Sequence, residues 1–95
     1  MITHIVCFKL IDRSPESVQK ARELLMGMEG KIPQLRHLEV GADVLHTERS
    51  YDLALITKFD SLEDLQTYQV HPVHVEVANY LAKVREAAVA VDFES

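Results

Sequence analysis

Residues 51–59 read Tyr-Asp-Leu-Ala-Leu-Ile-Thr-Lys-Phe and form the strongest strand pattern of this chain. Side chains alternate between the two faces of a strand, so Leu53 and Leu55 share one face. Ala54 and Ile56 share the other face. Both faces are therefore apolar, which is typical of a central strand in a sheet that is covered on both sides.

Three further strands are predicted around this one. Residues 2–9 (ITHIVCFK) also carry apolar side chains on both faces, and we expect them to form the other central strand. Residues 36–44 (RHLEVGADV) alternate between apolar and polar side chains, which is typical of a half-buried strand at a sheet edge. Residues 87–93 (AAVAVDF) form the last predicted strand.

Helical patterns fill the intervals. Residues 14–29 begin with Ser14 as a helix cap and Pro15 at the first helical position. Residues 62–69 and 73–86 read as a second helix that Pro72 interrupts. The apolar positions that we expect to face the sheet recur at helical spacing: Val18, Ala21, Leu24, Leu25, Met28, Leu62, Leu65, Tyr68, Val73, Val77, Tyr80, Leu81 and Val84.

The predicted order of elements is β-α-β-β-α-β within a single domain, residues 1–95. This order is typical of the ferredoxin-like α+β fold, an antiparallel sheet with helices on one face. The helices can cover only one side of the sheet, whereas both central strands are apolar on both sides. Since large exposed apolar faces are rare in stable monomers, we expect a homodimeric α+β barrel with an interface of about 2,000 Å² or more.

Composition excludes several classes of function. The 95 residues carry a net charge of −5 and no cluster of Lys or Arg, which argues against nucleic-acid and anionic-membrane partners. The single cysteine, Cys7, allows no intrachain disulfide, and no apolar segment has the length of a membrane span or the pattern of a secretion signal. We therefore expect a cytoplasmic protein. The glycines fit no phosphate-binding loop.

Five segments together resemble the stress-responsive A/B barrel (Dabb) domain family, namely residues 3–10 (THIVCFKL), 51–55 (YDLAL), 59–65 (FDSLEDL), 68–75 (YQVHPVHV) and 91–94 (VDFE). The run Tyr-x-x-His-Pro-x-His is the most specific of them. The resemblance covers nearly the whole chain and implies a dimeric α+β barrel. It implies activity less directly, because many members of the family have no known one.

One plant branch of that family contains polyketide cyclases that close an aromatic ring by aldol chemistry without a cofactor. The resemblance to this branch implies catalytic roles for Tyr68, His74 and His4. A further pocket histidine of the branch is replaced by Leu53 here. This departure weakens the inference to the branch's particular substrate and reaction.

The residues themselves suit such chemistry. A neutral imidazole can accept a proton near neutral pH, and a phenol can donate to a carbonyl oxygen that becomes an enolate. At about 100° per residue, His74 lies at the edge of the apolar stripe and His71 lies nearer solvent. We expect His71, Leu53 and Leu55 to contact a ligand. The alternative is structural: the histidines cap the helix break, and Tyr68 belongs to the core.

Three functions stay open on the sequence alone. The first is a homodimer that binds a small apolar molecule without turnover. The second is a cofactor-independent cyclase, lyase or isomerase, and the third is a relative of the small dimeric monooxygenases. A zinc site built from His71, His74 and His4 is also conceivable, but the helical angle separates the first two. We therefore expect no metal and no cofactor.

Overall fold

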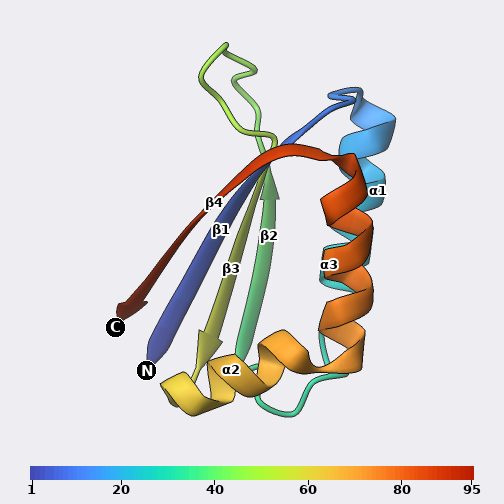
Figure 1. Ribbon diagram of the computed structural model, residues 1–95. Coiled ribbons are helices and arrows are strands. Elements are labelled where there is room, and N and C mark those ends of the chain that lie inside the picture. Colours follow the sequence, from blue (N-terminus) through green and yellow to red (C-terminus); the bar gives the residue numbers. More distant parts are fainter.

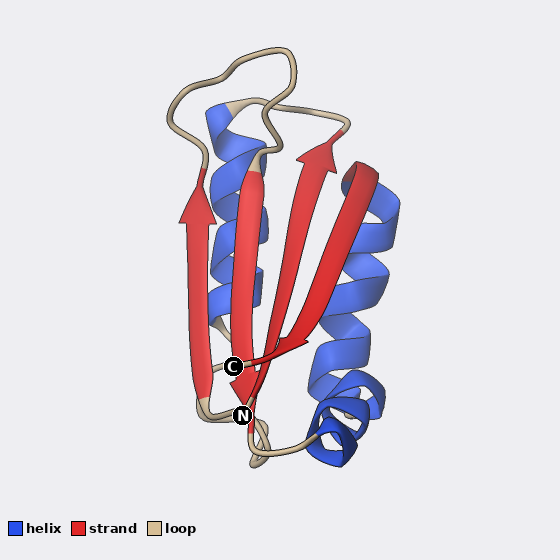
Figure 2. Ribbon diagram, turned by 90° about the vertical axis from the view of Figure 1, so that its left-hand side faces the viewer, coloured by secondary structure: helices blue, strands red, loops and turns tan.

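The computed structural model describes residues 1–95 as a four-stranded antiparallel sheet with three helices on one side (Figures 1 and 2). The strand order is β2-β3-β1-β4. The strands are β1 (Ile2–Leu10), β2 (His37–Ala42), β3 (Leu53–Phe59) and β4 (Arg85–Glu94); the helices are α1 (Pro15–Met26), α2 (Leu62–Val70) and α3 (Pro72–Val84). The predicted ferredoxin-like fold is confirmed, and β1 and β3 occupy its centre.

Serine caps start the first two helices. The Ser14 hydroxyl accepts the Ser17 backbone N–H at 3.3 Å, and the Ser61 hydroxyl accepts the Asp64 N–H at 3.1 Å. Each bond satisfies an N–H that the helix itself leaves without a partner, so these residues fix where α1 and α2 begin. No helix of the chain has the length and apolar character needed to cross a membrane.

The helix-facing side of the sheet carries the core. On the central strands this side consists of Ile2, His4, Val6, Phe8 and Leu10 in β1 and of Leu53, Leu55, Thr57 and Phe59 in β3. The opposite side faces away from all three helices, and Figure 2 shows it uncovered. Its apolar residues are Ile5, Cys7, Ala54, Ile56, Val89, Val91 and Phe93, which we call the open face.

Helix ends differ from the sequence-based expectation in two places. α1 ends at Met26 rather than at residue 29, because the chain turns after the cap residue Gly27 and Gly30 adopts a positive φ of 78°. Leu24 is 37% exposed rather than facing the core. On α2, Leu62 is likewise more exposed than expected.

The second correction concerns the start of the last strand. Arg85 and Glu86 belong to β4 and not to the preceding helix. The reason is tertiary: Arg85 pairs with Leu10 across the sheet, and the Ile11 N–H donates to the Val84 carbonyl at 2.9 Å. Because of these contacts, the helix ends at Val84 and the chain continues as a strand from Arg85.

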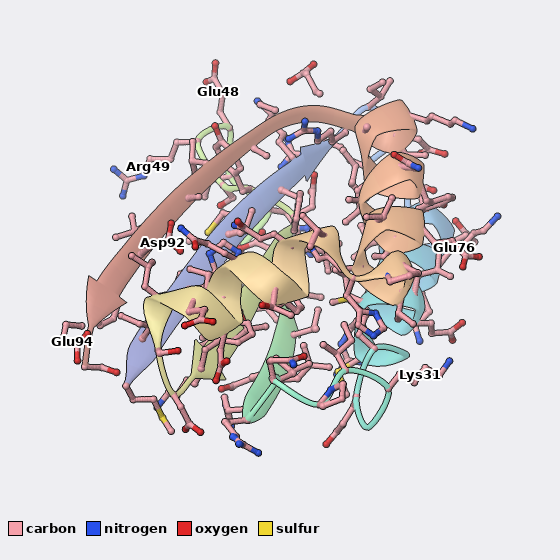
Figure 3. The ribbon with its side chains drawn as sticks, turned by 60° about the horizontal axis from the view of Figure 1, so that its bottom comes forward. Lys31, Glu48, Arg49, Glu76, Asp92 and Glu94 are labelled. Atoms are coloured by element: carbon pink, nitrogen blue, oxygen red, sulfur yellow. The ribbon has the colours of Figure 1, made fainter.

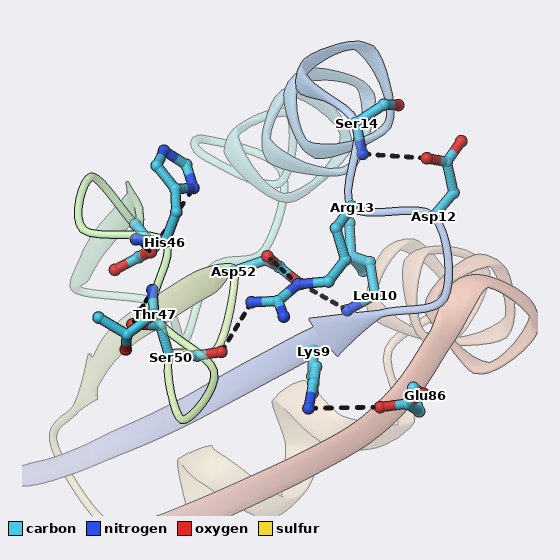
Figure 4. Close-up of polar contacts among 11 residues, drawn as sticks. Lys9, Leu10, Asp12, Arg13, Ser14, His46, Thr47, Ser50, Asp52 and Glu86 are labelled. Carbon is cyan, nitrogen blue, oxygen red and sulfur yellow. Dashed lines mark hydrogen bonds and ion pairs between the residues drawn. The ribbon is translucent and has the colours of Figure 1, made fainter.

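Asp52 anchors the chain where β1 ends and β3 begins (Figure 4). Its side chain is buried and accepts the Leu10 N–H at 2.8 Å and the Arg13 Nε–H at 2.9 Å. Arg13 also donates to the Ser50 carbonyl at 2.8 Å. A buried carboxylate needs such partners, so this cluster ties the segment after β1 to the segment before β3.

Candidate active site

A cavity of about 220 Å³ lies between the helix-facing side of the sheet and the helices α2 and α3. Hydrophobic residues make up 9 of the 13 that line it, among them Val6, Phe8, Leu55, Val77 and Leu81. The volume is smaller than the roughly 300–1,000 Å³ of sites for drug-sized ligands. The cavity therefore suits a small, mainly apolar molecule.

Tyr68, on α2, is fully buried at the inner wall of this cavity. Its ring packs against Phe59 at a centroid distance of 4.8 Å and against His74 at 4.4 Å. The hydroxyl donates only to the Met28 sulfur, at 3.9 Å, and a thioether is a weak acceptor. Burial raises the pKa of Tyr68 well above its ordinary value, so the hydroxyl stays protonated and can donate to a better acceptor.

His74, on α3, faces Tyr68 across the helix break. Its Nδ1–H donates to the Gln69 carbonyl at 3.0 Å, which leaves Nε2 as the nitrogen with a free lone pair. Burial lowers the pKa of His74, the nearby His4 lowers it further, and the bond to Gln69 acts in the opposite direction. The ring is therefore neutral at pH 7 and able to accept a proton.

His4 reaches the same cavity from β1. It is 7% exposed, and its ring lies edge-on to Tyr68 at 6.4 Å. The Nδ1–H of His4 donates to the carboxylate of Asp92, the residue directly opposite on β4. Figure 3 marks Asp92 on the side of β4 that faces α2. This bond fixes the His4 tautomer and leaves Nε2 without a partner in the protein.

The structure thus brings four of the six predicted site residues to one cavity: His4, Tyr68, His74 and Leu55. Leu53 is buried in the core but does not line this cavity. His71 also lies outside it. The His71 Nδ1 accepts the Val73 N–H at 3.1 Å and caps α3, which is the structural alternative for this histidine.

Three polar residues at the cavity escaped the sequence-based prediction. Gln69 and Arg85 line it, and Asp92 holds His4. The side-chain pattern of β4 could have indicated Asp92. Asp92 lies on the same face as Ala88 and Ala90 and is a polar residue in that apolar series. Arg85 gave no such signal, since its position was predicted to be helical.

The described residues contain no group of three or more His, Cys, Asp or Glu side chains arranged to hold a metal ion. The chemistry that the cavity itself offers is proton transfer. It combines a buried phenol that donates and imidazole nitrogens that accept, inside apolar walls.

The family model of the stress-responsive A/B barrel domain matches residues 2–95. The chain belongs to this family. A curated relative from Arabidopsis thaliana, the stress-response A/B barrel domain-containing protein DABB1, is 31% identical over 98 residues. The match covers 98% of this A/B barrel domain but only 46% of that protein, so the chain spans about half of its relative's length.

Two solved structures are similar to this A/B barrel domain over almost its whole length. A dimeric protein of unknown function with a ferredoxin-like fold, from Bacteroides fragilis, is 32% identical with a TM-score of 0.84, covering 99% of this chain and 95% of that one. A dimeric ferredoxin-like protein of unknown function from Thermobifida fusca is 29% identical with a TM-score of 0.87, covering 99% and 90%. These relatives support the fold and leave the activity open.

Proposed function

We propose that this A/B barrel domain is a cofactor-independent enzyme that performs acid-base chemistry on a small, mainly apolar carbonyl compound, as a cyclase, lyase or isomerase. One observation carries the proposal: Tyr68, His74 and the His4–Asp92 pair converge on a single apolar cavity. A structural role alone requires neither the neutral imidazole nor the phenol, whose hydroxyl has only a weak thioether acceptor, to face the same cavity.

The proposed mechanism assigns the first proton transfer to His74. Its Nε2 takes a proton from the carbon beside the carbonyl, and the Nδ1–H bond to Gln69 holds the ring in the tautomer that permits this. The electron pair moves onto the carbonyl oxygen. There the Tyr68 hydroxyl donates a hydrogen bond, which stabilises the developing enolate more strongly in an apolar cavity than in water.

His4 supplies a second nitrogen on the opposite wall. Its Nε2 can accept or return a proton while the Asp92 carboxylate stabilises the imidazolium that forms at the ring. Protonation of the enolate carbon then gives an isomer, attack on a second carbonyl closes a ring, and loss of a neighbouring group gives a lyase product. The cavity supports this class of reactions without selecting one of them.

Exchange of α-protons tests the proposed chemistry before the natural substrate is identified. We expect the protein to accelerate deuterium incorporation beside the carbonyl of a small ketone such as cyclohexanone in ²H₂O, followed by NMR. H74A abolishes the acceleration and keeps the fold. H37A, which changes an exposed histidine on β2, leaves it intact. Equal exchange by H74A and the unchanged protein would remove His74 from the mechanism.

Binding without turnover is the second candidate, and the apolar lining favours it. Native mass spectrometry of the purified protein separates the two. A retained apolar molecule that comes through incubation unaltered supports binding, whereas conversion of that molecule supports catalysis.

We also infer that the functional form is a homodimer in which a second copy covers the open face. Val89, Val91 and Phe93 are exposed there to 52%, 60% and 44%, and no helix of the chain covers them. An apolar surface of this kind is rare in stable monomers. The two solved relatives described above are dimeric, which supports the same assembly.

A further inference from the structure

Arg85 lies where α3 passes into β4 and borders the cavity that contains His4 and His74. It pairs across the sheet with Leu10, whose side chain is buried on the helix-facing side. The guanidinium group therefore belongs to the same side of the sheet as the candidate active site. It is the only Arg or Lys side chain in the lining of the cavity.

This guanidinium group has no acceptor within the protein. Three other arginines are engaged: Arg13 with Asp52, Arg22 with the Val40 carbonyl and Arg36 with Asp60. The Arg85 side chain, which is exposed, donates to no side chain and to no backbone oxygen of the protein. Arg49 is the remaining arginine without a partner, and it lies in the exposed loop before β3 (Figure 3).

The acidic groups nearest to Arg85 along β4 have other partners. Glu86 pairs with Lys9 at 3.6 Å, and Asp92 accepts from His4. Figure 4 shows the pairing of Lys9 with Glu86. The lining of the cavity contains no Asp or Glu, so its fixed charge is positive and is confined to the Arg85 end.

We propose that Arg85 binds a carboxylate of the substrate, so that the molecule held in the cavity is a small monoanion with an apolar body and a carbonyl group. A guanidinium group offers paired donors that match the two oxygens of a carboxylate. The apolar walls receive the body of the molecule, and Arg85 sets its orientation toward Tyr68 and His74. The carbonyl in this assignment rests on the proposed function; the carboxylate does not.

A structural role for Arg85 makes a different prediction. A cation near the last turn of α3 also stabilises the helix dipole, and the Arg85 backbone N–H already caps this helix through the Leu81 carbonyl. Such a role affects the folding stability but gives no preference between a charged ligand and its neutral analogue. Ligand discrimination therefore separates the two roles.

The test compares hexanoate with hexanamide, two probes of equal length, by isothermal titration calorimetry. We expect hexanoate to bind roughly tenfold or more tightly, in line with a hydrogen bond to a charged group. R85Q makes the two affinities equal. R49Q, the matched loss of the other unpaired arginine, preserves the difference.

Three results would overturn the assignment: equal binding of both probes to the unchanged protein, a preserved preference in R85Q, or tighter binding of hexyl phosphate than of hexanoate. Circular dichroism verifies that R85Q is folded. If R85Q is not folded, R85K replaces it in the test. R85K keeps the positive charge but lacks the paired donors, so we expect it to lose part of the preference for hexanoate over hexanamide. An unchanged preference in R85K contradicts the proposal.

The outcomes also keep this inference apart from the proposed function. Carboxylate binding that depends on Arg85, without any α-proton exchange, would remove the enzymatic proposal and leave the carboxylate assignment. Exchange on neutral ketones without a preference for hexanoate would remove the carboxylate assignment and leave the enzymatic proposal.

Discussion

His74 and Tyr68 occupy the same cavity wall and have opposite protonation requirements. Burial holds the phenol in its protonated form and the imidazole in its neutral form, so that a donor and an acceptor face each other at neutral pH. Neither residue needs a charged neighbour to reach this state. The burial of both groups therefore keeps each of them uncharged at neutral pH.

The pH dependence of folding reports on His74. Its pKa is lowered in the folded protein, so the unfolded chain binds the proton first as the pH falls through about 6.5. The stability contributed by the neutral ring is complete above that pH and is lost below it. We expect the melting temperature to fall more between about pH 7.5 and about pH 5.5 in the unchanged protein than in H74Q, which cannot titrate there.

Differential scanning calorimetry at both pH values checks this prediction. A difference in melting temperature that does not change with pH would show that burial leaves the titration of His74 unaffected.

The substitution Tyr68→Phe removes the hydroxyl of this residue and keeps its aromatic ring. We expect α-proton exchange to fall by about 100-fold to 1,000-fold, the usual loss when a donor to a developing oxyanion is removed. The melting temperature changes little, because the hydroxyl bonds only to the Met28 sulfur while the ring keeps its packing. Tyr80→Phe, on the half-buried tyrosine of α3, is the control and leaves exchange unchanged. Equal exchange by Y68F and the unchanged protein would assign Tyr68 to the core alone.

At the scale of elements, the junction between β1 and β3 depends on the carboxylate of Asp52. D52A leaves the buried Leu10 N–H and the Arg13 guanidinium without their acceptor, and we expect a loss of about 2–3 kcal/mol in the free energy of unfolding. D60A breaks an exposed pair with Arg36 and costs at most about 1 kcal/mol. Urea unfolding measures both, and equal losses would contradict an anchoring role for Asp52.

The elements also show how far a sequence can be interpreted. Apolar side chains on both faces predicted the central positions of β1 and β3, because such a pattern is typical of a central strand. The strand conformation of Arg85 and Glu86 was missed, since both residues suit a helix and only pairing with β1 makes them a strand. The convergence of His4 and Tyr68 depends on how the sheet and α2 pack, and spacing along the chain does not encode that distance.

At the scale of the whole molecule, the open face carries the proposed assembly. Val91 lies on β4 opposite Ile5 and is 60% exposed, so V91D places a charge on the open face. We expect V91D to be monomeric at micromolar concentration in light scattering, because a buried carboxylate without a partner opposes association. V70D changes a valine on α2 that is even more exposed, at 74%, and keeps the dimer. A stable monomer before any substitution would remove the proposed assembly.

The pairing of His4 with Asp92 joins residues 88 positions apart, from the first strand and the last. During synthesis on the ribosome, β1 emerges before its partner β4 and keeps one edge free until residues 85–94 have followed. Such long-range pairing is also slow to form, because a long loop must close before it is stabilised. The candidate active site is therefore completed only when β4 has been translated, and a chain that stops before β4 lacks the Asp92 carboxylate that holds His4 and has an unprotected sheet edge.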